Sequence, residues 1–377
     1  RLAAEGMRFT NVCCNNSICS PSRATILTGQ YSHKNGVPSL NGAINENSPQ
    51  VAAQLQKAGY QTAVFGKWHL TSQPKGFDTY KVTRGQGSWF DPVFFTKTGQ
   101  WYGKKKKRDR VPSEKHEGYC SDVYTDQALQ WLKARDAKKP FCMMLHFKAP
   151  HHSYEYPERW KDYLKDTLIP EPPSLHEDVE KTSPLLKGVH TWHMVDKNGY
   201  FGRHENDKEP PMWPHDGSIR SKTSAAYQHM IHKYLRAVGA VDDNIKRVID
   251  YLEKERIKDD TLIIYTSDQG YWLGQHGLYD KRLILEGSLK MPFIVRYPKE
   301  IKAGSVSEAL CSNVDFAPTL LDVASVPVPK AMQGFSLRPL LQGKYPANWR
   351  EGIWYAYWAT GHFHWGVRTH EHKLIRF

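Results

Sequence analysis

The chain has 377 residues, of which 40% are hydrophobic and 24% are charged, an ordinary globular composition. At ~100–200 residues per domain, this length predicts two or three domains and a core that needs no disulfide framework. No apolar run approaches the ~20 residues of a membrane span, so we expect no integral membrane span.

The charge balance points to an anionic partner. The chain carries 52 Lys and Arg against 39 Asp and Glu, a net charge of +13. Nucleic acid, a membrane surface and sulfated or phosphorylated glycans all fit such a balance. Part of the excess is the run from Lys104 to Arg108, for which a solvated loop is the simpler interpretation. Because no nucleic-acid-binding motif accompanies this run, we expect no nucleic-acid partner.

Both ends of the sequence resemble the middle of a larger protein. The first twelve residues, RLAAEGMRFTNV, begin like the last turn of a helix with Gly6 at its C-cap. The last six residues, HKLIRF, stop inside a strand-like alternation. We therefore expect a longer protein whose first strand lies upstream of this chain.

Helices and strands are predicted in the following order. Ser20, as N-cap, and Pro21 begin a short helix that ends at Gly29, and a second helix runs from Ser48 to Gly59. Apolar spacing of three and four residues predicts a long helix over 225–256. The remaining elements are apolar strands in 61–69, 139–152, 260–270 and 291–298 and a helix over 314–326.

These strands are continuous apolar runs, which is typical of strands buried on both faces of a parallel sheet. Helices that alternate with such strands indicate an open α/β fold with a mostly parallel sheet flanked by helices. The stretches 71–118 and 153–222 are rich in Gly, Pro, Trp, His and charge, and we interpret them as insertions. We expect a catalytic domain over 1–345 and the start of a small second domain over 346–377.

Polar residues follow three of the predicted strands. These residues are Lys67 and His69, then His151 and His152, then Asp268 and Gln269. Ligands of open α/β sheets bind beyond the carboxyl ends of the strands. A single histidine at a strand end is commonly structural, but three strand ends with polar residues together favour a functional site at this edge of the sheet.

Cys19 directly precedes the predicted SPSR helix start, and Arg23 lies about one turn further on. A helix N-terminus favours anions and activates a thiol, and a guanidinium can reach the same point. Two interpretations remain open: an anion site beside a nucleophile, or a structural cysteine.

The motifs of this chain resemble those of the sulfatase family. The segment CSPSRATILTG resembles the sulfatase signature, in which the cysteine is oxidised to formylglycine. Further similar segments follow in the order of the family: GKWHL, APHH, TSDQGYWLGQHGLYDKR and GVRTHEHKLIRF. The resemblance implies an alkaline-phosphatase-like α/β fold with a small C-terminal antiparallel subdomain, and hydrolysis of a sulfate ester.

The resemblance also implies roles for individual residues. Formylglycine would form at Cys19, and its hydrate would attack sulfur and later expel sulfate. The sulfate oxygens would contact Arg23, Lys67 and Lys281. Matching the motifs assigns collapse of the hydrate to His69 and a general-acid role at the bridging oxygen to His151.

The family metal is a divalent cation, Ca²⁺ or Mg²⁺, bound by oxygens. Asp268, Gln269 and the oxygen of converted Cys19 would supply ligands. Gln269 departs from the Asn or His that many members carry there. An Asp-Asp pair on the first strand of the family has no counterpart in this chain.

The motifs look most similar to glycan sulfatases of the N-acetylglucosamine-6-sulfatase type. We therefore expect a sulfated glycan as substrate, hydrolysed at the 6-O-sulfate of a glucosamine unit, and a formylglycine-generating maturation enzyme as partner. An aryl- or choline-type sulfatase and an inactive glycan-binding relative are the alternatives. By resemblance, the compartment would be periplasmic, secreted or lysosomal.

Overall fold

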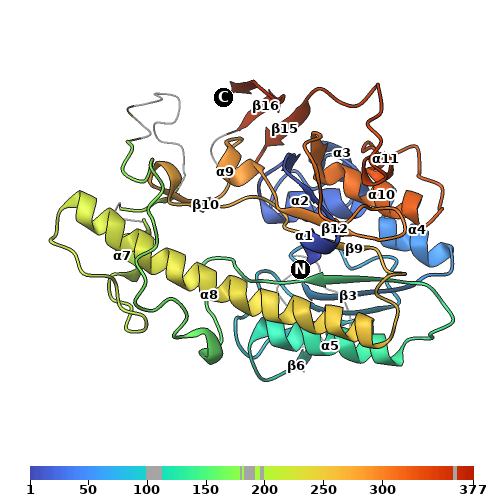
Figure 1. Ribbon diagram of the computed structural model, residues 1–377, viewed down its shortest axis with the longest axis horizontal. Helices are drawn as coiled ribbons and strands as arrows, with labels where there is room; N and C mark the ends of the chain where they lie inside the picture. The colour runs from blue at the N-terminus through green and yellow to red at the C-terminus, as the bar shows by residue number, and fades with distance from the viewer. Residues whose placement is uncertain (99–112, 179–180, 182–191, 196–198, 360–362) are drawn as a thin grey trace.

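The computed structural model describes residues 1–98, 113–178, 181, 192–195, 199–359 and 363–377. The elements form two larger sheets with helices packed against them, and a small sheet near the carboxyl end (Figure 1). The run from Lys104 to Arg108 lies outside the described residues. No helix in the described part of the chain is long and apolar enough to cross a membrane.

The first sheet consists of β3 (Gln61–Lys67), β4 (Thr79–Thr83), β5 (Val93–Thr96), β6 (Ser113–Lys115) and β7 (Phe141–His146). Their order is β6-β5-β4-β3-β7. Strand β3 runs parallel to both β4 and β7, and β5 and β6 continue the sheet in antiparallel fashion. Every position of β3 after its first residue is buried, as its continuous apolar sequence predicts.

The second sheet consists of β1 (Met7–Phe9), β9 (Ile263–Thr266), β12 (Phe293–Arg296) and β13 (Ser305–Ser307). Their order is β13-β1-β12-β9, and β12 is antiparallel to both of its neighbours. Of the four predicted strands, β3 and β7 pair in parallel as expected, whereas β9 and β12 pair in antiparallel fashion. The other parallel neighbour of β3 is β4, which lies in the stretch 71–118 that we interpret as an insertion. A continuous apolar run reports burial on both faces of a strand and does not report its direction.

Strands β7 and β9 are edge strands, each with a strand partner on one side only in the described part of the chain. Although both are apolar, every residue of both strands is partly exposed. Their free sides therefore present unpaired backbone groups. The carboxyl ends of the two strands nevertheless meet at one side chain, because Arg23 contacts both His146 and Asp268.

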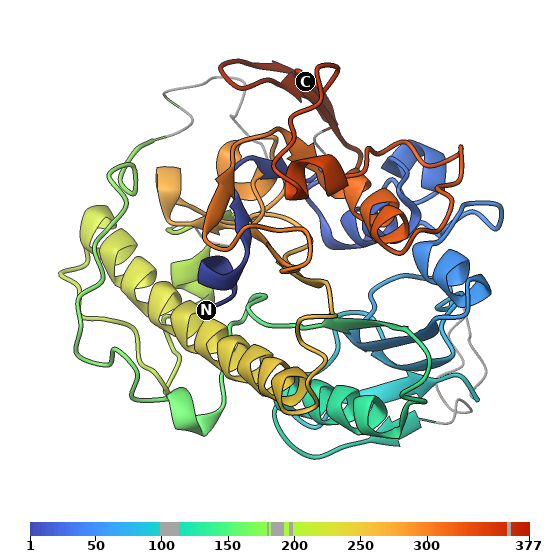
Figure 2. The ribbon, with the colours of Figure 1, turned by 45° about the vertical axis from the view of Figure 1, so that its right-hand side comes forward.

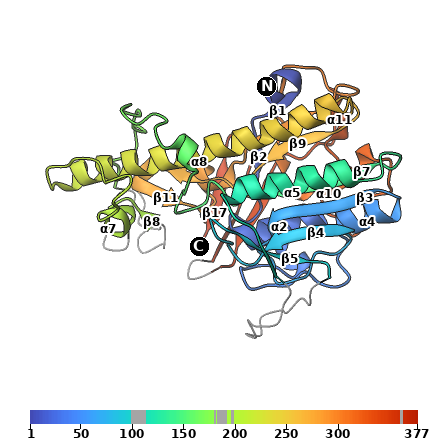
Figure 3. The same cartoon turned by 90° about the horizontal axis from the view of Figure 1, so that it is seen from below.

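Helices cover the sheets. The longer ones are α2 (Cys19–Thr28), α4 (Val51–Lys57), α5 (Cys120–Ala134), α8 (Ile219–Lys254) and α10 (Phe316–Val323). Helix α5 packs against β3, β7 and α8, and Figure 3 shows α5 and α8 side by side. The short ones are α1 (Leu2–Glu5), α3 (Ser32–Asn35), α7 (Tyr200–His204), α9 (Glu286–Leu289) and α11 (Arg338–Leu341).

Several predicted helix bounds differ from the structure. The helix expected from Ser48 begins at Val51, and the one expected over 314–326 is α-helical over Phe316–Val323. Helix α2 has Ile18 at its N-cap and no side-chain cap, because the Ser20 hydroxyl donates to the carbonyl of His69 at 2.6 Å instead. Its end at Gly29, in the left-handed region at φ 62°, is as predicted. Helix α8 begins six residues before the expected position 225, since Ser218 caps it ahead of the apolar stripe.

The stretch 153–222 supplies α7 and β8 (Trp192–His193), and β8 extends a small sheet formed by β10 (Trp272–Leu273) and β11 (Leu278–Asp280). A further short pair joins β2 (Val12–Cys13) to β14 (Cys311–Ser312). This arrangement places the second predicted insertion beside the residues that follow β9.

The carboxyl end forms the antiparallel sheet β15-β16-β17, with β15 at Ile353–Tyr357, β16 at His364–Arg368 and β17 at Lys373–Arg376. Tyr355 and Tyr357 of β15 belong to the same hydrophobic cluster as Phe9 and Cys19. The small C-terminal sheet thus packs directly on the amino-terminal elements.

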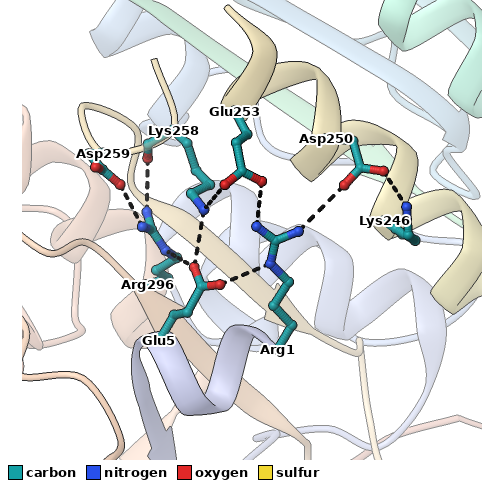
Figure 4. Close-up of polar contacts among 8 residues, drawn as sticks. All are labelled: Arg1, Glu5, Lys246, Asp250, Glu253, Lys258, Asp259 and Arg296. Atoms are coloured by element: carbon teal, nitrogen blue, oxygen red, sulfur yellow. Dashed lines mark hydrogen bonds and ion pairs between the residues drawn. The ribbon is translucent and has the colours of Figure 1, made fainter. Parts of the chain in front are cut away.

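The amino end of the chain is fixed to the end of α8 by charged side chains (Figures 2 and 4). Arg1 pairs with Glu5 at 2.9 Å and also with Asp250 and Glu253. Glu5 accepts a further hydrogen bond from Arg296 of β12. We call this group the terminal network; its members are Arg1, Glu5, Lys246, Asp250, Glu253, Lys258, Asp259 and Arg296.

Candidate active site

Helix α2 presents Cys19 as its first residue, and the side chain is only 1% exposed. The helix N-terminus directs its unpaired backbone N–H groups and its positive dipole end toward this position. Arg23 lies one turn further along α2. The structure therefore keeps the predicted pairing of a buried cysteine with a guanidinium at the start of one helix.

Arg23 joins the carboxyl ends of three strands. Its Nη1 donates to the carbonyl of Lys67 at 2.6 Å and lies 3.5 Å from His146 Nδ1. Its Nε donates to Asp268 Oδ2 at 2.8 Å. The ends of β3, β7 and β9 thus converge on α2, as the strand-end argument predicts.

Lys67 is a buried cation, 2% exposed. Burial lowers the pKa of Lys67 to about 8, and the positive charges of Arg23 and Lys281 add to that lowering. The carboxylate of Asp268 acts against this lowering. A bound anion here would stabilise the charged form of Lys67.

Lys281 follows β11 and is 4% exposed. Its Nζ pairs with Asp280 Oδ1 at 2.8 Å and lies 3.3 Å from His151 Nε2. Burial disfavours the charged form, but the carboxylate of Asp280 outweighs it and raises the pKa of Lys281 above its ordinary value. Lys281 therefore remains protonated, and its position links Cys19 to His151.

His151 is oriented by two hydrogen bonds. Its Nδ1 lies 2.6 Å from the carbonyl oxygen of His152, and its Nε2 faces Lys281. Because a carbonyl and an ammonium group are the partners, Nδ1 carries the proton and Nε2 accepts. Burial holds the pKa of His151 well below its ordinary value, and Lys281 adds to that effect. The ring is therefore neutral, with Nε2 turned to the cationic group.

His69 follows β3 in the left-handed region, at φ 54°. Its carbonyl accepts from Ser20 of α2, which holds the residue beside the helix start. Burial lowers the pKa of His69 to about 3, and the nearby Lys67 and Arg23 contribute. Its Nδ1 is buried and has no hydrogen-bond partner.

Asp268 and Gln269 follow β9 and offer oxygens. Burial alone would raise the pKa of Asp268, but Arg23 and Lys67 outweigh it, so the group stays a carboxylate. Gln269 Oε1 is buried and has no hydrogen-bond partner in the part of the chain that the structure describes. A buried acceptor without a donor fits a cation ligand. The described residues contain no cluster of three or more His, Cys, Asp or Glu that could hold a metal ion.

The structure brings together all six predicted catalytic residues and adds others that the sequence argument missed. His146 ends β7 beside Arg23, and its place after an apolar run was a usable signal. Asp280 is 1% exposed and pairs with both Lys281 and Arg282. The only signal in the sequence for these ion pairs was that Asp280 directly precedes Lys281. We call the charged residues Arg23, Lys67, Lys281, Arg282, Asp268 and Asp280 the site cluster.

Comparisons with known proteins identify the family of this chain. The Sulfatase family model matches residues 1–326. The chain is 40% identical to an N-acetylglucosamine-6-O-sulfatase of Bacteroides thetaiotaomicron, over 100% of this chain and 73% of that protein. It is 28% identical to the human N-acetylglucosamine-6-sulfatase, over 94% of this chain and 62% of that protein.

The solved structure of another protein, in complex with its substrate D-glucosamine-2-N,6-O-disulfate, superimposes on this chain with a TM-score of 0.88. The two chains are 37% identical, and the match covers 100% of this chain and 82% of the other. The chain therefore belongs to the sulfatase family of sulfuric ester hydrolases and has its alkaline-phosphatase-like fold.

Proposed function

We propose that this chain hydrolyses an O-sulfate on a glycan, at the 6-position of a glucosamine unit. The observation that carries the proposal is the placement of two buried cations, Lys67 and Lys281, and the part-buried Arg23 around the buried start of α2 at Cys19. Two of the similar proteins are named for the 6-sulfate of N-acetylglucosamine, which supports that position.

The cations stabilise the charge of the reacting sulfuryl group. Lys67 and Lys281 are held in place before substrate arrives, since both are buried and Lys281 is anchored on Asp280. Preorganised cations in a water-poor site stabilise developing negative charge more strongly than in water. Conversion of Cys19 to formylglycine would supply the nucleophile, an aldehyde hydrate, and requires the maturation enzyme as partner.

The departing sugar oxygen needs a proton, and the Lys281–His151 pair can provide it. The ammonium of Lys281 faces His151 Nε2 at 3.3 Å, so one proton is shared between two groups on the same side of the site. Transfer of this proton to the bridging oxygen neutralises an alkoxide that would otherwise leave poorly. His69 Nδ1 has no hydrogen-bond partner among the described residues and can hold a proton beside the start of α2.

Asp268, Gln269 and the oxygen of converted Cys19 would hold a divalent cation, for which Ca²⁺ is our first choice and Mg²⁺ the second. The unpaired Gln269 oxygen and the ionised Asp268 fit a hard cation that prefers oxygen ligands. Such an ion would add positive charge at the sulfate oxygens. Gln269 is an unusual choice for the family, but its side-chain amide offers the same donor atom as Asn.

We further propose that residues 1–345 form the catalytic domain and 346–377 the beginning of a C-terminal subdomain. A strand from upstream of Arg1, with an acidic pair, would fill the space between the free sides of β7 and β9. The exposed apolar residues of both strands support this. A version of the chain extended upstream should melt at a higher temperature and bind Ca²⁺ more tightly. Equal values for both versions would contradict the proposal.

The proposed substrate is a sulfated glycan. From this substrate we infer that the protein is periplasmic, secreted or lysosomal. The test is sulfate release from glucosamine 6-O-sulfate, N-acetylglucosamine 6-O-sulfate, 4-nitrophenyl sulfate and choline sulfate, with the protein co-expressed with a formylglycine-generating enzyme. Turnover of the aryl or choline ester alone would replace the proposal by a small-molecule sulfatase. Binding of sulfated sugars without turnover of any ester would indicate an inactive relative.

A further inference from the structure

A second group of imidazoles lies next to His151 and begins with its neighbour in the chain, His152. His152 Nε2 lies 3.3 Å from His204 Nε2, and His204 Nδ1 lies 2.8 Å from Asp207 Oδ2. His204 is the last residue of α7, in the stretch 153–222 that the sequence presents as an insertion. The reaction proposed above uses neither His204 nor Asp207.

The hydrogen-bond network assigns the protons of this chain of groups. A carboxylate only accepts, so His204 Nδ1 carries a proton that it donates to Asp207. Burial lowers the pKa of His204, although Asp207 opposes the lowering, so the ring is neutral and its Nε2 is an acceptor. Burial likewise lowers the pKa of His152 to about 4. His152 therefore donates its Nε2–H to His204.

His152 is therefore held through both its side chain and its backbone carbonyl. Its side chain is tied to His204, and its backbone carbonyl accepts the Nδ1–H of His151 at 2.6 Å. Aromatic packing keeps the rings in place: His204 stacks on Tyr200 at 4.3 Å, and His152 meets Tyr154 edge to face at 5.6 Å. A shift of residue 152 would move the carbonyl that orients His151.

We propose that the His204–Asp207 pair is a positioning device for His151, which acts through the side chain and the carbonyl of His152. His152 thus connects the His204–Asp207 pair to His151. The part of this proposal that concerns turnover rests on the proposed glycan sulfatase function. The part that concerns the geometry of His151 does not.

The kinetic test uses His204→Phe, which keeps a ring but cannot accept from His152. We expect kcat on glucosamine 6-O-sulfate to fall on the order of 10²-fold, the cost of a displaced catalytic group, with little change in KM. On 4-nitrophenyl sulfate, whose phenolate leaves without a proton, kcat should fall by less than about threefold. Equal losses on both esters would show a merely structural role and overturn the proposal.

Two further variants sharpen the test. His204→Gln keeps an oxygen that can accept from His152 and should recover most of the kcat that His204→Phe loses. Tyr200→Phe removes the hydroxyl bonded to His229 in the same cluster but keeps the ring that stacks on His204, so it should behave as wild type. A His204→Gln enzyme no better than His204→Phe would contradict a role for the acceptor.

A measurement without substrate separates this proposal from the proposed function. Ring ¹⁵N spectra of histidine-labelled protein, assigned with His151→Gln, report which nitrogen of His151 carries the proton. We expect the His151 signals to show an Nδ1–H ring in wild type and in Tyr200→Phe, and to change in His204→Phe. Unchanged His151 signals in His204→Phe would overturn the positioning role even if the enzyme cleaved every ester offered. Failure of wild type to cleave any ester would overturn only the proposed function.

Discussion

Two groups of charged residues in this molecule differ in their charge balance and in the exposure of their side chains. The site cluster has four cations and two carboxylates, so positive charge is in excess. The terminal network has four cations and four carboxylates, and its charges balance (Figure 4). Lys67 and Lys281 of the site cluster are 2% and 4% exposed. In the terminal network, the side chains of Arg1 and Glu253 are 42% and 50% exposed.

This difference separates a binding site from a structural contact. Burying a cation without a matching anion costs free energy, which the lowered pKa of Lys67 reflects. Exposed, balanced pairs cost little and contribute little. A buried cluster with unbalanced charge is therefore a candidate for anion binding, whereas a network with balanced charge is a structural contact.

The largest effect should come from Cys19, at the centre of the site cluster. Cys19→Ala removes the group that becomes the nucleophile, so kcat should fall at least about 10⁴-fold. Binding of a sulfated sugar should persist, because Arg23, Lys67 and Lys281 remain. Sulfate release and calorimetric titration with substrate measure the two effects. Cys14→Ala is the matched control, since Cys14 is also fully buried but its thiol faces the carbonyl of Ser288. Equal loss of turnover in both variants would count against Cys19.

The next effect tests the excess charge itself. Lys67→Met should lower kcat/KM about 10²–10³-fold, since one preorganised contact to the developing charge is lost. The same variant should melt at a higher temperature than wild type, because an uncompensated buried charge is gone. In the terminal network, Lys258→Met should leave kcat/KM within about twofold and lower the melting temperature slightly. A stabilised but fully active Lys67→Met enzyme would remove Lys67 from the site.

Removal of the cation should have a smaller, reversible effect on substrate affinity and rate. A chelator should reduce sulfate release, and added Ca²⁺ should restore it. Gln269→Leu should raise the Ca²⁺ concentration for half-maximal activity at least about tenfold, the lower end for loss of even an outer-shell partner. Gln275→Leu is a control amide, since its oxygen is already bonded to the backbone of Leu273. Chelator-insensitive turnover would exclude the metal role of Gln269.

The sequence predicted the parts of the site that local patterns encode. Lys67 and Asp268 end apolar runs, and Cys19 and Arg23 share one helix. Their positions in the sequence alone therefore identified them as candidate site residues. Lys281 was found only through the resemblance to the family, because no strand pattern precedes it. The same reasoning expected the open α/β fold and the C-terminal antiparallel sheet.

Contacts between distant segments were beyond that reasoning. His204 meets His152 across 52 positions, and nothing in either local sequence indicates the other. The hydroxyl of Ser20 serves a contact with His69, 49 positions away, instead of the expected helix cap. The direction of β12 also depends on its neighbours, β1 and β9, and not on its own apolar residues.

The smallest predicted effect lies in the terminal network and depends on pH. The hydrogen bond from Arg1, together with Arg296 and Lys258, lowers the pKa of Glu5 from 4.5 to about 2. A carboxyl whose pKa is lower in the folded state binds fewer protons there than in the unfolded chain. Its contribution to stability is therefore complete above about pH 4.5 and is lost as the pH falls toward 2.

Glu5→Gln should therefore lower the melting temperature at neutral pH by no more than about 1–2 °C, because its partners are partly exposed. The difference from wild type should shrink steadily below about pH 4.5 and vanish near pH 2, where Glu5 is protonated in both states. Thermal scans of both proteins across this range check the sign. A difference that grows toward low pH would mean that Glu5 is destabilising when ionised, and the terminal network would then resemble the site cluster instead of contrasting with it. Unchanged sulfate release in Glu5→Gln completes the contrast, because a structural contact far from Cys19 should leave the rate untouched.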